Sequence, residues 1–166
     1  MKGVGKYGEV MAGEPQQASY DEVLEKLRKV ARSGSQVKAI LDFTCKELRR
    51  VFPHYTWIGV YRVDGGDLVL AGWAGPAATQ HTRIPLGNGV CGLAARTGVT
   101  VNVPDVHKDP RYLECFVSTN SEIVVPIARD GAVSGEIDVD SDRLDAFDPR
   151  DAALLEALAA ELAPIL

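Results

Sequence analysis

A hairpin near the C-terminus is the strongest constraint that this sequence places on its fold. Two runs of strand-forming residues, 121–128 and 132–140, are joined by Asp130-Gly131, a pair that favours a tight turn. A second pair of runs, 56–63 and 67–74, is joined by Asp64-Gly65-Gly66. Because hairpins pair their strands antiparallel, the middle of the chain is predicted to form an antiparallel sheet.

Helical patterns flank the predicted strands. Apolar residues recur at helical spacing over 19–30, 37–48 and 148–162, and a short helix is predicted over 90–97. The last of these helices is predicted to be capped by the run 148–151, which begins Asp-Pro. Strands and helices do not alternate as in a parallel α/β protein, so the sequence predicts an α+β domain built in layers.

The domain organisation is predicted to be simple. With 166 residues, the chain is long enough for one domain with a substantial core. Residues 1–18 are rich in glycine and show no periodicity, which predicts a flexible N-terminal extension. Ser19, followed three residues later by Glu22, has the spacing of a capping box, so a single domain is predicted over 19–166.

Composition excludes several classes of function. The net charge of −5 and the lack of a basic stripe argue against a nucleic-acid partner. No apolar run reaches the roughly eighteen residues of a membrane span, and no signal peptide is apparent, so no membrane partner and a cytoplasmic location are predicted. The three cysteines are then expected to be free thiols. Neither CxxC nor HxxxH spacing occurs, so neither a metal nor a cofactor is predicted.

The strand predicted over 133–140 alternates between an apolar and a polar face. Its polar positions are Ser134, Glu136, Asp138 and Asp140, while the preceding strand is apolar on both faces apart from Glu122. One interpretation is a polar face turned toward solvent. The other is a ligand pocket, because a strand that is apolar on both faces is expected to be covered on both faces. Clustered carboxylates would favour a cationic ligand.

The register of this hairpin decides between the two interpretations. A regular two-residue turn at 130–131 would pair Glu122 with Val139 and place Glu122 on the face away from Asp138 and Asp140. One extra residue would bring all three carboxylates to one face. We therefore expect a bulge, most readily at Pro126, or a three-residue loop.

The cysteines and a glycine-rich run complete the set of chemically informative residues. Cys45 lies on an apolar helical stripe and is predicted to be core. Cys91 follows the glycine turn at a predicted helix N-terminus, where the helix dipole lowers a thiol pKa, although a small buried residue fits this position equally well. Cys115 lies in a loop, beside Glu114. The run 87–92 matches GxGxxG but lacks the strand and long helix of a dinucleotide site.

As a set, six segments resemble a GAF domain and, within that superfamily, the free methionine-(R)-sulfoxide reductases. These segments are WIGVY (57–61), RIP (83–85), GNGVCG (87–92), DVH (105–107), NSEIVVP (120–126) and DVDS (138–141). The resemblance implies a GAF-like antiparallel sheet of about six strands with helices on both faces. It also implies a homodimer packed through terminal helices.

The resemblance also implies roles for individual residues in the reduction of free L-methionine-(R)-sulfoxide to methionine. Cys115 would be the nucleophile and Cys91 a second redox thiol, with a thioredoxin-like donor restoring the thiols. The implied substrate-binding residues are Glu122, Asp138, Asp140, Trp57 and Tyr61.

The chain departs from the family pattern in its thiols. The family usually has a further cysteine just before Arg-Ile-Pro, where this chain has His81-Thr82. Either Cys91 or an external thiol would then have to resolve oxidised Cys115. The alternative function is a non-catalytic GAF module for small-molecule binding or dimerisation. A chromophore- or haem-binding sensor lacks an apparent pair of ligating residues.

Overall fold

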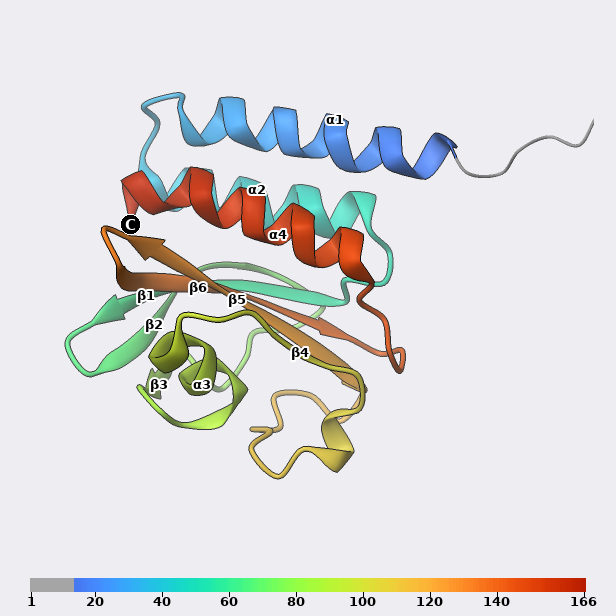
Figure 1. Ribbon diagram of the computed structural model, residues 1–166, viewed down its shortest axis with the longest axis vertical. Helices are drawn as coiled ribbons and strands as arrows, with labels where there is room; N and C mark the ends of the chain where they lie inside the picture. The colour runs from blue at the N-terminus through green and yellow to red at the C-terminus, as the bar shows by residue number, and fades with distance from the viewer. Residues whose placement is uncertain (1–13) are drawn as a thin grey trace, which may run out of the picture.

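A six-stranded antiparallel sheet forms the centre of the computed structural model, which describes residues 14–166 (Figure 1). The strand order is β3-β2-β1-β6-β5-β4. The strands are β1 (Trp57–Asp64), β2 (Asp67–Ala74), β3 (Arg83–Pro85), β4 (Val101–Val103), β5 (Ser121–Arg129) and β6 (Ala132–Ser141). Both predicted hairpins are present, as β1–β2 and β5–β6. The α+β class and the six strands are confirmed.

Helices cover both faces of this sheet. They are α1 (Glu14–Ala31), α2 (Val37–Val51), α3 (Gly89–Thr97) and α4 (Pro149–Leu162), with 3₁₀ turns η1 (Val106–Lys108) and η2 (Ala163–Ile165). Figure 1 shows α2 and α4 against one face, α1 as a further layer over them, and α3 on the opposite face. The larger apolar core lies under α2 and α4, and a second, smaller core lies under α3. The smaller core surrounds the candidate site described below.

The start of α1 differs from the sequence prediction. The helix begins at Glu14, so Ser19 lies inside it and the predicted capping box is wrong. Residues 14–18, expected to belong to the N-terminal extension, are helical; the rest of that extension, residues 1–13, lies outside the described residues. The physical reason is that serine is only mildly unfavourable inside a helix, so a good capping residue does not by itself end one.

The start of α4 is as predicted. The side chain of Asp148 accepts hydrogen bonds from the backbone N–H groups of Arg150 and Asp151, and Asp151 accepts one from the backbone of Asp148. This capping box, with Pro149 at the first helical position, fixes where α4 begins.

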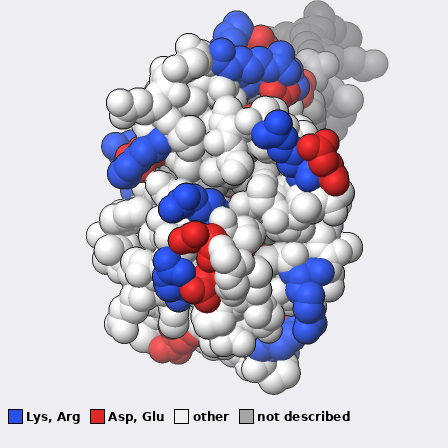
Figure 2. Space-filling model, turned by 90° about the vertical axis from the view of Figure 1, so that its left-hand side faces the viewer, with Lys and Arg blue, Asp and Glu red and all other residues white. Residues whose placement is uncertain are grey.

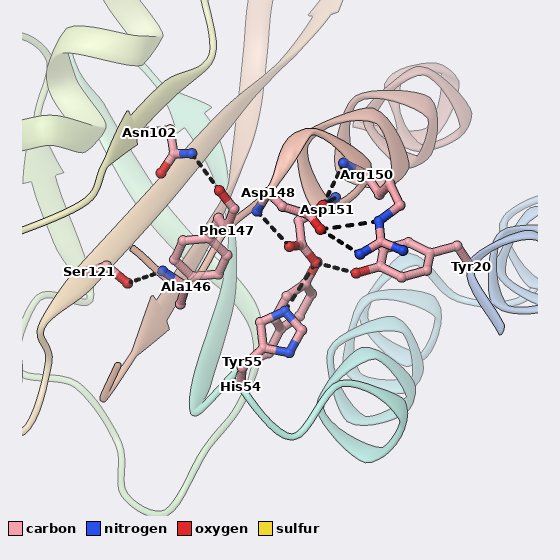
Figure 3. Close-up of polar contacts among 10 residues, drawn as sticks. All are labelled: Tyr20, His54, Tyr55, Asn102, Ser121, Ala146, Phe147, Asp148, Arg150 and Asp151. Carbon is pink, nitrogen blue, oxygen red and sulfur yellow. Dashed lines mark hydrogen bonds and ion pairs between the residues drawn. The ribbon is translucent and has the colours of Figure 1, made fainter. Parts of the chain in front are cut away.

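Asp151 also ties three elements together (Figure 3). Its Oδ1 accepts hydrogen bonds from the hydroxyls of Tyr20 on α1 and Tyr55, each at 2.8 Å, and from His54 Nε2 at 3.1 Å. Burial alone raises the pKa of Asp151, but the hydrogen bonds from His54, Tyr55 and Tyr20 outweigh it and leave that pKa below its usual value. A charged Asp151 therefore holds α1 to the start of α4.

The register of β5 and β6 contains the expected irregularity. The turn residues Asp130 and Gly131 have φ values of 53° and 81°, as a tight hairpin turn requires. Arg129 pairs with Ala132 and Ala128 with Val133, but Ile127 then pairs with Gly135, so Ser134 is an extra residue in β6. The bulge is confirmed and its predicted position at Pro126 is wrong. Ser134 suits the position because its hydroxyl donates to the carbonyl of Ile127 at 3.3 Å.

Charged side chains of both signs are spread over one face of the molecule (Figure 2). Figure 2 shows acidic and basic side chains interspersed on the face that it presents, rather than gathered into a basic stripe. None of the helices in residues 14–166 is long and apolar enough to cross a membrane. The cytoplasmic location stays a prediction.

Candidate functional site

Four carboxylates lie buried on the face of the sheet that α3 covers. Glu122 on β5 is 6% exposed, and Glu136, Asp138 and Asp140 on β6 are each 2% exposed or less. The bulge sets this arrangement, because it pairs Glu122 with Asp140 and Val124 with Asp138. The interpretation of these residues as a solvent-facing polar surface is therefore wrong.

Most of these carboxylate oxygens have no protein partner. Within residues 14–166, no hydrogen bond reaches Glu122 Oε2, Asp138 Oδ1, Asp140 Oδ2 or either oxygen of Glu136. Buried polar atoms are rarely left in this state, since each unpaired group costs about 1–3 kcal/mol. Such a cluster is suited to a cationic ligand.

Burial and mutual repulsion shift these groups toward their neutral forms. Burial raises the pKa of Asp138 to about 7. For Glu122 and Asp140, burial followed by the charge of Asp138 raises the pKa well above its usual range. The pKa of Glu136 is also raised, chiefly by burial. A bound cation would reverse these shifts, because an opposite charge favours the ionised form.

Cys91 joins this cluster from α3. It lies in the first turn of the helix, where Gly92 packs so closely on Gly87 that a Cβ would lie 2.6 Å from its backbone. The thiol is 5% exposed and donates to Asp138 Oδ2 at 3.5 Å. Burial, then Asp138 and Glu136, raise the pKa of Cys91 well above its usual value. This direction is opposite to the lowering expected at a helix N-terminus, and the burial of Cys91 also fits the other interpretation, a small buried residue.

Cys115 is the most accessible of the three thiols. It lies in the loop before β5, partly exposed, and its Sγ is 3.6 Å from the carbonyl of Leu113. Burial, followed by the charges of Asp138 and Asp140, raises the pKa of Cys115. Cys45 is fully buried in the helical core, as predicted. The pKa values of both thiols near the carboxylates are thus raised.

A small pocket brings two thiols and two carboxylates together. It is lined by His81, Ile84, Gly89, Val90, Cys91, Leu113, Cys115, Glu122 and Asp138. Its free volume is about 10 Å³, enough for about one water. Asp140, Trp57 and Tyr61 do not line it.

Two loops close this pocket on the α3 side. His81, from the loop before β3, donates through Nε2 to the carbonyl of Glu114 at 3.1 Å. The Tyr61 hydroxyl donates to the carbonyl of His81 at 2.9 Å, and the backbone N–H of His81 donates to Thr79 Oγ1 at 3.0 Å. His81 therefore links the sheet, through Tyr61, to the loop that carries Cys115.

An aromatic group lies next to the carboxylates. Trp57 pairs with Asp140 across β1 and β6, and Tyr61 pairs with Glu136. The Trp57 ring stacks on Trp73, with centroids 6.5 Å apart, and lies 6.1 Å from Phe116. Its Nε1–H is buried without a partner among the described residues. The predicted residues Trp57 and Tyr61 thus belong to the surroundings of the pocket rather than to its present lining.

Sequence reasoning missed two residues of this region. Glu136 was recognised only as part of a polar face, although the same alternation places it on the face of Asp138 and Asp140. His81 was noted as a departure from the family pattern, but its bond to Glu114 connects segments that local sequence does not relate. The sequence also did not predict that Trp73 and Phe116 lie beside Trp57, because nothing but their aromatic character distinguishes them.

Comparisons with known proteins place the fold and the site in context. A protein-family model described as GAF domain matches residues 34–166. The GAF domain-containing protein A of Dictyostelium discoideum is 38% identical over 133 residues, covering 80% of this chain and 82% of that protein. A free methionine-R-sulfoxide reductase of Saccharomyces cerevisiae is 43% identical over 107 residues, covering 62% and 58%. The solved structure of free methionine-R-sulfoxide reductase from Neisseria meningitidis in complex with its substrate is 38% identical, covers 96% of this chain and 95% of that one, and has a TM-score of 0.84.

Proposed function

The chain belongs to the GAF domain family, and from this premise we propose that it reduces free L-methionine-(R)-sulfoxide to methionine. The observation that carries the proposal is the position of Cys115, in one pocket with two buried carboxylates that have unpartnered oxygens. The names of two similar proteins, from S. cerevisiae and N. meningitidis, support the same reaction.

The carboxylates would recognise the α-ammonium group of the substrate. Glu122, Asp138 and Asp140 offer acceptors that the protein leaves unpaired. Charge-assisted hydrogen bonds to an ammonium would stabilise their ionised forms and offset the cost of their burial. A methionine inside a peptide has no free ammonium to offer, so this recognition selects the free amino acid. Trp57 and Tyr61, on the neighbouring strand β1, would pack against the apolar part of the substrate.

Binding requires the loops over the pocket to move. A volume that holds about one water cannot hold an amino acid. The hydrogen bond between His81 and Glu114 joins the two loops, and its release would help to open the way to Cys115. Closure over the substrate would then exclude water from the thiol and the sulfoxide.

Cys115 would carry out the reduction. Its thiolate attacks the sulfoxide sulfur, and the oxygen passes to the cysteine, so that Cys–SH and the sulfoxide become Cys–SOH and the thioether. A general acid supplies a proton to the sulfoxide oxygen as its bond to the substrate sulfur breaks, and this oxygen remains on Cys115 as the sulfenic acid. Substrate ammonium bound among the carboxylates offsets the negative charges that raise the pKa of Cys115.

A second thiol would complete the cycle. The sulfenic acid of Cys115 condenses with a thiol, releasing water and forming a disulfide. Cys91 lines the same pocket, which makes it the internal candidate for this step. A thioredoxin-like dithiol then reduces the disulfide and restores both cysteines. His81 stands where the family usually supplies another thiol, so this chain has to rely on Cys91 or on the external donor.

The alternative is a GAF module that binds a small molecule without turnover. One observation favours it: the pKa values of both Cys91 and Cys115 are raised, so neither thiol is poised for reaction without a ligand. The name of the D. discoideum relative refers to a domain and not to a reaction.

Thioredoxin-coupled turnover distinguishes the two functions. NADPH consumption would be followed with free methionine-(R)-sulfoxide for wild type, Cys115→Ser, Cys91→Ser and, as a matched control, Cys45→Ala. The reductase predicts turnover that Cys115→Ser abolishes and Cys45→Ala retains. If the wild type binds the amino acid by calorimetry but neither consumes NADPH with thioredoxin nor forms methionine with dithiothreitol as the donor, the binding module is the correct function.

The quaternary structure belongs to the same proposal. We expect a homodimer packed through the terminal helices, because α1 forms the outer layer of the helical side (Figure 1). Light scattering during size-exclusion chromatography would show twice the chain mass if this is correct, and the chain mass if it is wrong.

A further inference from the structure

We infer that the buried pocket also binds a thiophilic divalent cation, with zinc as the ion of best fit, through Cys91, Glu122 and Asp138. The three residues come from α3, β5 and β6 and lie far apart in the sequence. Their ligand atoms are all buried and all within 4.8 Å of one another. The sequence predicted no metal site because it lacks ligands at short regular spacing, a criterion that does not detect ligands brought together only by the fold.

The separation of Cys91 and Asp138 suits tetrahedral zinc. Cys91 Sγ and Asp138 Oδ2 are 3.5 Å apart. Zinc bonds of about 2.3 Å to sulfur and about 2.0 Å to oxygen, at the tetrahedral angle, place the two ligand atoms about 3.5 Å apart. The thiol and the carboxylate therefore already have the separation of two zinc ligands.

A second observation points to a ligand independently of the spacing. The side chains of Glu122 and Asp138 are almost completely buried and line the pocket, and each has an oxygen with no hydrogen-bond partner among residues 14–166. An ion in the pocket would satisfy the unpaired oxygen of Glu122 and would replace the Cys91 thiol proton as the partner of Asp138 Oδ2. A purely structural acidic cluster would be expected to satisfy them with its own donors.

The donor set selects among cations. Calcium takes six to eight oxygen ligands and magnesium prefers octahedral oxygen coordination, so neither suits a site of three ligands that includes sulfur. Zinc accepts one thiolate and two carboxylates in a tetrahedron.

Zinc and the amino acid would exclude each other. The oxygens of Glu122 and Asp138 that would bind the metal are those that would bind the substrate ammonium. A metal-bound Cys91 is also withdrawn from disulfide formation. Zinc is thus expected to inhibit turnover competitively; this consequence rests on the proposed reductase function, whereas the binding of zinc does not.

Metal binding can be measured without any assay of turnover. The chain, reduced and freed of metal, would be titrated with zinc chloride by calorimetry, and with cadmium chloride while the ultraviolet charge-transfer band of a cadmium–thiolate bond is recorded. The variants are Cys91→Ser and Glu122→Gln. Cys115→Ser is the matched control, because it removes a thiol from the same pocket but not a proposed ligand. Circular dichroism and thermal melting would establish that each variant is folded.

The expected result is one zinc ion per chain and a cadmium–thiolate band that Cys91→Ser abolishes and Cys115→Ser keeps. Both Cys91→Ser and Glu122→Gln should weaken zinc binding at least about tenfold, since even the loss of an outer-shell partner has an effect of that size. Absence of zinc binding in the wild type, or loss of the band in Cys115→Ser but not in Cys91→Ser, would overturn the inference. Turnover in the presence of a chelator, together with no binding of zinc, would leave the reductase function intact and remove only the metal site.

Discussion

Glu122 and Asp140 face each other across β5 and β6, with both side chains buried beneath α3. Their pairing depends on Ser134, the extra residue that shifts β6 by one position relative to a regular hairpin. Without that shift Glu122 would lie on the face of the sheet that α2 and α4 cover. One bulge therefore gathers the carboxylates into a single site.

Removing one charge of this pair is expected to weaken amino-acid binding. Glu122→Gln keeps the shape of the side chain but removes the charge that would pair with the ammonium. Affinity for free methionine sulfoxide should fall about 10- to 100-fold, the range of a charge-assisted hydrogen bond. Calorimetry measures this, with the exposed Glu114→Gln as a control that should bind as wild type does. Equal affinities in both variants would show that Glu122 does not contact the ligand.

Glu136 is expected to cost the protein stability. Its side chain is 0% exposed, neither carboxylate oxygen has a partner in the described structure, and Asp138 lies nearby. Glu136→Gln should therefore raise the free energy of unfolding at neutral pH by about 1–2 kcal/mol, because folding has to protonate a carboxylate that is ionised in the unfolded chain, and glutamine does not carry this cost. Urea denaturation of this variant and of Glu114→Gln, which should change by less than about 0.5 kcal/mol, provides the measurement. A clear loss of stability in Glu136→Gln would mean that the carboxylate has a stabilising partner.

The Trp57 ring needs the space that Gly59 leaves for it. A Cβ on Gly59 would lie 2.4 Å from the indole, whereas a Cβ on Gly66 would have nothing within 4 Å. Gly59→Ala should destabilise the protein by about 1–3 kcal/mol through overpacking, and Gly66→Ala should change stability by less than about 0.5 kcal/mol. Tryptophan fluorescence during urea unfolding reports both the stability and the environment of Trp57. Similar behaviour of the two variants would contradict this packing.

Asp151 is expected to be the most sensitive polar residue of the helical side. Asp151→Ala removes the acceptor of Tyr20, Tyr55 and His54 and half of the α4 capping box. The free energy of unfolding should fall by about 3 kcal/mol or more, since buried donors are left unpaired. Tyr20→Phe, which removes one donor and keeps the acceptor, should cost about 1 kcal/mol. Equal losses of unfolding free energy in Asp151→Ala and Tyr20→Phe would show that the network stabilises only the packing of α1.

Glu47 is expected to make the free energy of unfolding depend on pH in the acidic range. Hydrogen bonds from Arg50, and then from Lys26, lower the pKa of Glu47 from 4.5 to about 2. Between these values the folded chain binds fewer protons than the unfolded chain, so stability decreases as the pH falls from about 4.5 toward 2. Glu47→Gln should flatten this part of the profile and cost about 1 kcal/mol at neutral pH, a small value because Lys26 and Arg50 are exposed. Thermal melts across this pH range test the prediction. If Glu47→Gln loses as much stability in acid as the wild type does, the prediction is wrong.

Much of the fold could be predicted because it follows from local patterns. Alternation and turn residues identified both hairpins, and Asp148-Pro149 identified the start of α4. The requirement that Glu122 share a face with Asp138 and Asp140 even predicted a bulge. Its position at Ser134 was not predictable, because the side-chain hydrogen bond to Ile127 that suits it is made across the hairpin. The start of α1 was missed because Ser19 is compatible with both a cap and a helix interior.

By itself, the sequence determined which residues of a single strand or helix share a face and therefore which side chains could form a site. Only the tertiary structure decided what covers that face. Burial under α3, the bond between His81 and Glu114, and the approach of Cys91 to Asp138 join segments distant in the chain. The raised pKa values of the carboxyls and thiols follow from that enclosure, because a pKa responds to the loss of water and to neighbouring charges rather than to residue type. Periodicity is a property of the chain, whereas the electrostatics of this site depend on its burial.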